Sequence, residues 1–240
     1  MKSFIYGLLL HFRLDLRNKD VLITYYLVPL AFFFLMGGIF SYITPESKST
    51  LTGSMVVFAI TMGSALGTPI PLIEHYGGVV RKAFQAGGIP IWAELVWTFV
   101  SGFFHLGLVA IFISTLAPLV FNADAPVNLP AFIAGLVVFL STSLLVGCLF
   151  GLLVKTTAKL TLLSQALFLP SVLLAGIMFP SSYLPGFLQK MALVLPATWG
   201  FKALTASQLS WANLWPLLLI SAMCLAAIAW RLRSISESEP

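Results

Sequence analysis

Residues 130–153 read PAFIAGLVVFLSTSLLVGCLFGLL, and this stretch decides the fold class. It lies in a longer run, 125–154, that contains no Asp, Glu, Lys or Arg. A helix needs about 20 apolar residues to cross the hydrocarbon core of a bilayer. Because lipid offers the backbone no hydrogen-bond partner, such a stretch must satisfy its amides internally. The sequence therefore predicts a membrane-spanning helix here.

Five further runs lack charged side chains, namely 21–45, 49–73, 95–123, 160–189 and 203–230. Charged residues make up 9 % of the chain and hydrophobic residues 59 %, whereas soluble domains have about 25 % charged residues. The alternating pattern of a membrane barrel is absent. The sequence predicts an all-α integral membrane protein with a single transmembrane domain over 1–240. The six spans are expected near 21–43, 52–73, 95–119, 130–153, 160–179 and 212–230.

Lysine and arginine predict the orientation, because they are enriched on the cytoplasmic side. With both termini and the tail 231–240 in the cytoplasm, ten basic residues lie inside and three outside. The inner set is Lys2, Arg13, Arg17, Lys19, Arg81, Lys82, Lys155, Lys159, Arg231 and Arg233, and the outer set is Lys48, Lys190 and Lys202. The basic residues are dispersed over separate loops, so the net charge of +5 indicates topology, and no nucleic-acid partner is expected.

Residues 1–20 are amphipathic. Five apolar residues recur at helical spacing, and four cations accompany them, which predicts a helix lying in the inner interface and touching the lipid bilayer. The apolar residues are Phe4, Ile5, Leu8, Phe12 and Leu16. A solvated cap on the first span is the alternative.

The inner connection 74–94 reads EHYGGVVRKAFQAGGIPIWAE. Glycine pairs bracket 79–86, which predicts a short helix whose Phe84 could enter a groove on a soluble partner. An interfacial linker that places its two cations among lipid headgroups is an equal alternative.

The outer connection 180–211 is apolar but rich in proline. Pro180 is expected to stop the fifth helix, Pro185 to lie in the first turn of a half-membrane helix, and Pro196 to end that helix. Non-helical backbone at membrane depth is tolerated only against protein or a water-filled cavity. The segment therefore predicts a re-entrant outer lid. The gate residues are Pro180, Tyr183, Pro185, Phe187 and Pro196. An interfacial plug is the alternative.

Motifs for nucleotide binding and hydrolysis are missing from the sequence. It contains no GxxxxGK[ST], HExxH, CxxC or GxSxG pattern. No acidic residue lies at the middle of a span, and His105 is the one ionisable candidate there, read first as a neutral, hydrogen-bonded histidine. Cys148 and Cys224 are expected to be buried apolar residues. The chain is therefore expected to be no enzyme, with no catalytic, cofactor or metal site, and to draw energy from a partner.

The whole chain resembles an ABC-2 type permease, the membrane subunit of a bacterial ABC exporter. The resemblance rests on the N-terminal helix, the six spans, the segment between spans 2 and 3, and the broken apolar segment before the last span. Glu74 and Gly77 match the acid-and-glycine start of the family's coupling segment. The resemblance implies coupling to an ATPase through Glu74, Val80, Arg81, Lys82 and Phe84.

The resemblance also implies a separate ABC ATP-binding subunit that holds ATP and Mg, and pairing as a homodimer or with a similar permease. We expect a bacterial cell (inner) membrane location and export of a hydrophobic or amphipathic substrate, such as a drug, lipid or peptide. Candidate pathway residues are His105, Ser164, Phe168, Ser171 and Met178. The alternatives are a non-transporting assembly or anchoring protein and, less favoured, an ion-coupled carrier.

Overall fold

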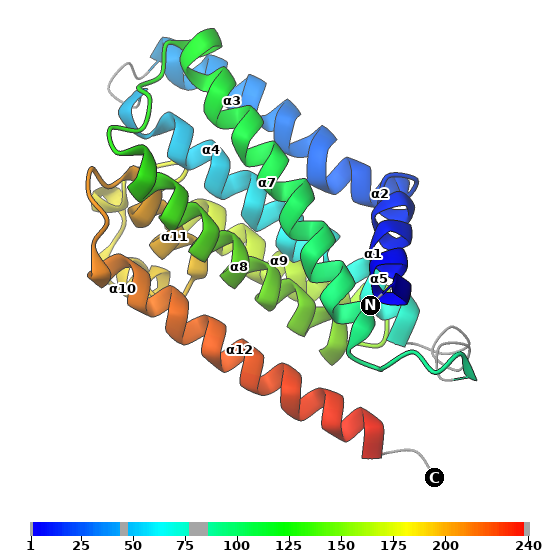
Figure 1. Cartoon of the computed structure of the whole chain (residues 1–240). Helices are drawn as coiled ribbons and strands as arrows, with labels where there is room; N and C mark the ends of the chain where they lie inside the picture. The colour runs from blue at the N-terminus through cyan, green and yellow to red at the C-terminus, as the bar shows by residue number, and fades with distance from the viewer. Residues whose placement is uncertain (1, 44–47, 77–85, 238–240) are drawn as a thin grey trace.

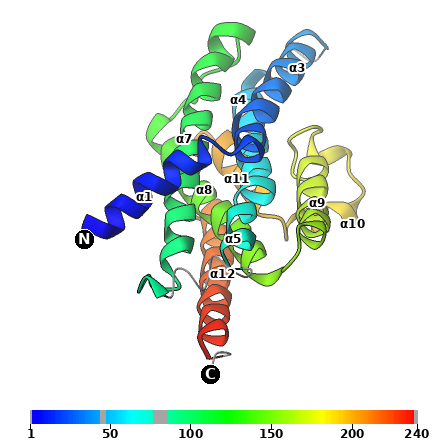
Figure 2. The ribbon, with the colours of Figure 1, turned by 90° about the vertical axis from the view of Figure 1, so that its right-hand side faces the viewer.

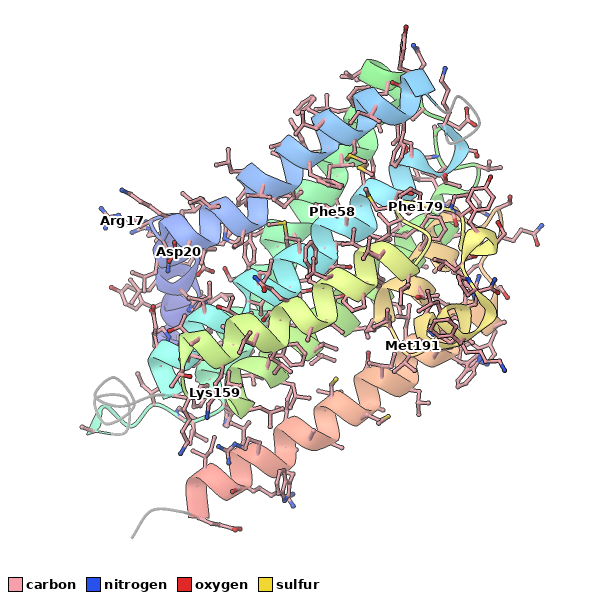
Figure 3. The ribbon with its side chains drawn as sticks, turned by 180° about the vertical axis from the view of Figure 1, so that it is seen from behind. Arg17, Asp20, Phe58, Lys159, Phe179 and Met191 are labelled. Carbon is pink, nitrogen blue, oxygen red and sulfur yellow. The ribbon has the colours of Figure 1, made fainter. Side chains whose placement is uncertain are left out.

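The computed structural model describes residues 2–43, 48–76 and 86–237, and these are helical apart from short connections (Figure 1). Six helical segments are long and apolar enough to cross a membrane: Lys19–Tyr42, Lys48–Tyr76, Ala93–Phe121, Leu129–Leu153, Thr157–Leu174 and Trp211–Glu237. The predicted all-α class and the six spans are confirmed. Arg17 and Lys159 lie at one end of the bundle, and Phe179 and Met191 lie at the other (Figure 3).

Two of the spans are interrupted by π-helical turns. The first consists of α2 (Lys19–Leu22), η1 (Ile23–Leu27) and α3 (Val28–Ile43), and the second of α4 (Lys48–Met62), η3 (Gly63–Gly67) and α5 (Pro69–Tyr76). The remaining spans are α7 (Ala93–Phe121), α8 (Leu129–Leu153), α9 (Thr157–Leu174) and α12 (Trp211–Glu237). Helix α1 (Lys2–Asp15) precedes them, and η4 (Ser181–Tyr183), α10 (Gly186–Ala192) and α11 (Pro196–Thr205) lie between α9 and α12.

Side-chain caps fix where several helices begin. Asn18, Asn128 and Thr156 precede α2, α8 and α9, and each accepts a hydrogen bond from a backbone N–H of the first turn. These amides have no partner within the helix, so the caps supply one. The polar residue before each apolar run thereby sets the start of the span.

The second span forms the centre of the bundle. In its most apolar window 83 % of the residues are buried, against 17 % for α9. Glycines let α8 approach it closely: a Cβ at Gly147 would meet the Ser64 carbonyl oxygen at 2.1 Å. A Cβ at Gly151 would meet the Cβ of Leu72 at 2.7 Å. Small residues at these positions allow the two backbones to touch.

The two π-helical turns pack against each other around Tyr25. Its ring occupies the space beside Gly63 and Gly67, and its hydroxyl lies 3.0 Å from the Thr68 hydroxyl. A π-helical turn exposes backbone groups and often marks a functional position. Here a hydrogen bond joins Tyr25 of the first turn to Thr68, the residue that follows the second turn.

The fifth span ends earlier than predicted. Helix α9 stops at Leu174, and Gly176 then adopts a left-handed conformation with φ of +91°. Glycine enters this conformation readily and so ends the helix, whose last residue lies four residues after the internal Pro170. The prediction that Pro180 stops this helix was wrong, because the chain has already left the helix there.

The segment after α9 forms short helices, and its prolines have other roles than predicted. Pro185 is the residue that precedes α10, and Pro196 opens α11 and does not end a helix. A proline in the first turn loses no hydrogen bond, because that amide has no acceptor anyway. The Thr198 hydroxyl and the Trp199 indole donate to the carbonyls of Ala192 and Leu193, and thus fasten α11 to the end of α10.

Helices α10 and α11 differ in burial. Gly200 of α11 packs against the Phe139 ring of α8, and Ala203 lies beside Gly135. By contrast, Phe187 and Met191 of α10 are exposed. Helix α11 therefore belongs to the core, whereas α10 lies on its outside.

The last helix runs further than the predicted span. It continues to Glu237, and Arg231 donates through Nε to the Leu152 carbonyl oxygen at the end of α8. Ile235 is still buried. The first part of the expected polar tail 231–240 is therefore helix.

The close contact of α8 with the second span can be tested by a single methyl group. We expect Gly147→Ala to lower the thermal midpoint of the purified protein, because overpacking against backbone costs about 1–3 kcal/mol. Gly38→Ala is the control, since a Cβ there meets nothing within 4 Å. Equal midpoints for the two variants, measured by thermal unfolding in detergent, would contradict this packing.

Candidate functional site

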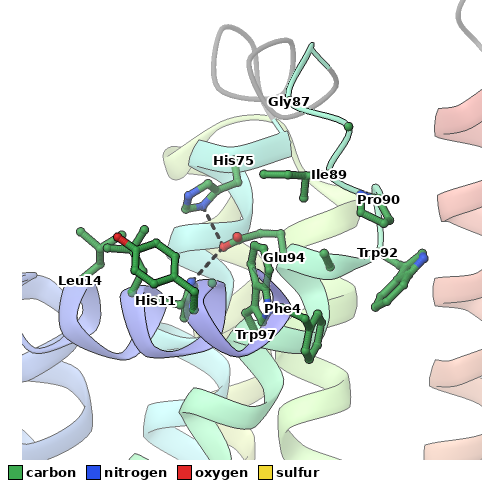
Figure 4. Close-up of a pocket in the computed structure, with 15 residues that line it drawn as sticks. Phe4, His11, Leu14, His75, Gly87, Ile89, Pro90, Trp92, Glu94 and Trp97 are labelled. Carbon is green, nitrogen blue, oxygen red and sulfur yellow. Dashed lines mark ion pairs between the residues drawn. The ribbon is translucent and has the colours of Figure 1, made fainter. Parts of the chain in front are cut away.

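Four titratable side chains from three helices meet at one end of the bundle, and Figure 4 draws His11, His75 and Glu94 among them. His11 and Asp15 come from α1, His75 from α5 and Glu94 from the start of α7. Glu94 Oε1 lies 3.3 Å from His11 Nδ1 and 3.0 Å from His75 Nδ1. His11 Nε2 lies 3.5 Å from Asp15 Oδ2. We call these four residues the ionic cluster.

The ionic cluster fastens α1 to α7. His11 and Asp15 are four residues apart, so both point to the same face of α1. That face is buried, and Asp15 also accepts a hydrogen bond of 2.5 Å from the Ser101 hydroxyl. Glu94 is only 3 % exposed, and a buried carboxylate requires such partners. The polar face of α1 is thus directed into the protein.

Burial and charge both shift the pKa values in the ionic cluster. Burial lowers the pKa of His11, but its hydrogen bond to Glu94 and the charges of Asp15 and Glu94 outweigh burial, so the pKa lies above its ordinary value. Burial raises the pKa of Asp15, and the nearby His11 and the Ser101 hydroxyl oppose this only in part. The docked helix therefore holds protons more tightly on both residues.

An open groove of about 1130 Å³ lies between α1 and the start of α7. Phe4, Trp92 and Trp97 contribute aromatic walls, and His11, His75 and Glu94 contribute its polar part (Figure 4). The Phe4 ring lies 6.0 Å from the Trp92 ring and 5.7 Å from the Trp97 ring. Among the described residues, no group of His, Cys, Asp and Glu is suited to hold a metal ion. The distances between its histidines and carboxylates make the cluster an ion-pair network.

Of the residues proposed to couple to an ATPase, the structure describes Glu74. This residue is exposed near the end of α5, next to His75 of the ionic cluster. Val80, Arg81, Lys82 and Phe84 lie outside the described residues, as does most of the predicted helix 79–86.

His105 lies deeper in the bundle and contacts α1 and the first span. Its ring stacks on Phe12 with 4.4 Å between centroids, and its Nδ1 is hydrogen-bonded to the Tyr26 hydroxyl. It is 1 % exposed, in keeping with the hydrogen-bonded histidine that was read first.

The other proposed pathway residues lie on or after α9. Ser164 and Ser171 are fully buried within the subunit, and their hydroxyls have no hydrogen-bond partner among the described residues. Phe168 packs edge-on against Phe58 of α4, and Phe58 stacks on Phe32 of the first span with 3.7 Å between centroids. These residues thus face the interior of one subunit.

The proposed gate residues lie together at the end of the bundle opposite α1. Tyr183 and Phe187 are 79 % and 64 % exposed, Pro180 and Pro185 are exposed as well, and Pro196 is buried at the start of α11. The gate residues therefore share one segment of the chain, but four are exposed and one is buried.

Sequence reasoning missed the ionic cluster. His11 and Asp15 carry one usable signal, the spacing of four residues on a helix that was expected to be amphipathic. Nothing in the sequence indicates that His75 and Glu94, which are 19 residues apart, converge on that helix.

The role of Glu94 in holding α1 can be tested by removing its charge. Glu94→Gln should weaken α1 docking by about 1–3 kcal/mol, because His11 and His75 lose a charged acceptor. Spin labels at the exposed Leu9 and Ile111 should then give a second, longer distance population. Glu74→Gln, a nearby exposed acid, is the control and should keep a single population.

The pH dependence of the same distance has a defined sign. Both raised pKa values favour the docked helix at low pH, and this advantage is lost as pH rises through the pKa of docked His11. The longer population should therefore grow as the pH rises from 6.5, the ordinary histidine value, through the raised pKa of docked His11. A distribution that stays constant in that interval would show that protons do not control docking.

Comparison with known proteins connects this architecture with a family. Residues 8–209 match the family description "ABC-2 type transporter". No curated protein and no solved structure matches the chain. The match includes α1 from residue 8 onward, the first five spans and the outer helices, which is more than half of the chain. The protein is thus a multi-pass membrane protein that belongs to the ABC-2 type transporter family, the transmembrane permeases of ABC transporters.

Proposed function

We propose that the chain is the membrane-spanning subunit of an ATP-driven exporter for a hydrophobic or amphipathic substrate, such as a drug, lipid or peptide. The observation that carries this proposal is the family match over residues 8–209. The family implies an ABC ATP-binding partner, and on this proposal ATP and Mg²⁺ bind to that partner. The substrate class is supported by the sequence, because the six predicted spans contain no Asp, Glu, Lys or Arg that would favour a highly charged substrate.

We further propose that the end bearing α1 faces the cytoplasm of a bacterial cell, at its inner membrane. The sequence assigns ten of its thirteen basic residues to this side, and Lys and Arg are enriched on the cytoplasmic side of membrane proteins. Helix α1 supports an interfacial position, because it exposes apolar Ile5, Leu9 and Leu14 together with Arg13. Labelling of Lys48 from the cytoplasmic side of intact cells would contradict this topology.

Coupling is proposed through the connection 74–94. Its two ends are α5 and the start of α7, and the ionic cluster joins both to α1. A partner that presses on this connection would therefore move three elements together. This link supports a mechanism in which ATPase closure rocks the six-span subunit.

The outer segment is proposed as a lid over the exit. Helix α11 starts beside the middle of α8, since Gly200 contacts Phe139, ten residues or about 15 Å after the start of α8. Helix α10 is attached to α11 but exposes Phe187. In this proposal α11 stays packed against α8, while the exposed α10 moves to open the exit.

The proposed function is tested by reconstitution. The chain should co-purify with an ABC ATP-binding subunit, and the pair in proteoliposomes should move an amphipathic dye only when ATP is hydrolysed. A membrane anchoring or assembly protein would bind its partner without transport. An ion-coupled carrier would transport without the ATPase.

The coupling proposal predicts a local effect of Phe84→Ala. Loss of a buried aromatic anchor should weaken the complex with the ATPase by about 2 kcal/mol, measured by surface plasmon resonance. Arg81→Glu should weaken it as well. Phe187→Ala, at the other end of the bundle, is the control and should bind normally. Unchanged binding in both inner variants would make 74–94 a linker only.

The lid proposal predicts that rigid linkage stops export. Cysteines at Phe187 in both subunits of a pair, once cross-linked, should abolish dye transport but leave ATPase binding intact. Reduction of the bond should restore transport. Pro185→Ala should have a milder effect, because a proline next to the helix start helps but is dispensable. Full transport by the cross-linked pair would remove the gating role.

A further inference from the structure

Gln165 is a polar side chain in an unusual place. It lies at the midpoint of α9, eight residues or about 12 Å from the start of the helix at Thr157, and its side chain is exposed. Among the six spans, α9 has the smallest buried share. Figure 2 shows α9 and α10 at one flank of the bundle, opposite α1.

Three hydroxyl side chains on the span surfaces are satisfied by their own helices. Thr115, Ser141 and Thr161 donate to the carbonyls of Phe112, Val137 and Thr157 at 2.7 to 2.9 Å. The Gln165 amide has no hydrogen-bond partner within the described part of the chain. A primary amide carries two donors and an acceptor. Leaving it unsatisfied in hydrocarbon is costly by several kcal/mol.

The exposed face of α9 has the pattern of a helix–helix seam. Its stripe runs through Ala158, Leu162, Gln165, Leu169 and Leu173. Spacings of three or four residues keep these five side chains on one face of the helix, which a second helix could contact. The opposite face, with Leu160, Ser164 and Ser171, is buried in the subunit. One polar residue in an apolar seam commonly fixes the register and the partner.

We propose that α9 packs against α9 of a second copy of this chain, with the two Gln165 amides hydrogen-bonded to each other. A two-fold axis along the membrane normal places the same residue of both copies at the same depth. An amide is self-complementary, because each copy can both donate and accept. Lipid cannot fill this role, and a carboxylate or ammonium partner would leave part of the amide unsatisfied. The inference rests on the proposed permease pair and specifies its contact.

Cross-linking tests the contact directly. In a chain whose Cys148 and Cys224 are replaced by alanine, Gln165→Cys should form a disulfide-linked dimer when native membranes are oxidised with iodine. Met223→Cys on α12 is the matched control, since that side chain is also exposed within a span. Ser164→Cys, one residue away but buried, should not cross-link either. Gln165→Cys yields no higher than those of Met223→Cys would overturn the proposal.

A second measurement examines the amide itself. Gln165→Leu should raise the dimer dissociation constant roughly threefold or more, as interhelical hydrogen bonds in membranes are modest, and Gln165→Asn should restore part of the affinity. Energy transfer between labelled copies in liposomes reports this constant. An unchanged constant in Gln165→Leu would overturn the amide pair. Cross-links to a different chain, with none between identical copies, would overturn the choice of partner.

The outcomes separate this inference from the proposed function. If Gln165→Cys copies do not cross-link although ATP-driven dye transport proceeds, the contact is wrong and the permease stands. If they cross-link but no ATPase binds and no transport occurs, the contact stands and the exporter function is wrong.

Discussion

A bilayer interior offers polar groups no solvent, and the structure depends on this constraint throughout. Backbone amides are satisfied within helices, and the caps at Asn18, Asn128 and Thr156 extend this to the helix starts. The buried carboxylate of Glu94 is matched by two histidines. Tyr25 pairs with Thr68 across two irregular turns. The same constraint makes the exposed Gln165 informative, since its amide has no partner among the described residues of one subunit.

The constraint also explains how much of the fold was predictable. Charges are costly at the middle of a span, so charge-free runs in the sequence located all six. The fifth span was misjudged because its charge-free run, 160–189, continues beyond the helix. The outer segment that follows the helix is also free of charged residues, so the charge-free run does not mark the helix end. Gly176 ends the helix, and its left-handed backbone is not apparent from composition. Proline at 180 and 196 was visible, but its position relative to a helix end was not.

The candidate sites were less predictable, because they depend on contacts between distant segments. His11, Asp15, His75 and Glu94 each resemble ordinary residues near a span end, and only tertiary packing joins them. The apolar periodicity of 1–20 predicted a helix, but the structure shows that its polar side packs inward against α7. Gln165 was overlooked because a search for charges passes over a neutral amide. In both cases the side chain stands out only once its exposure is known: the ionic cluster is largely buried, and Gln165 is exposed. A single sequence does not contain this information.

The early end of α9 has a consequence for the surrounding lipid. Eighteen helical residues extend about 27 Å, slightly less than a hydrocarbon core of about 30 Å, whereas the 29 residues of α7 exceed it. The fifth span is therefore subject to hydrophobic mismatch, with its deficit at the end where α10 lies. At that end, Phe187 and Met191 of α10 expose apolar side chains. A change in bilayer thickness would thus affect α9 and the attached α10 before the longer spans. The lipid composition of the membrane would in this way influence the position of the outer segment.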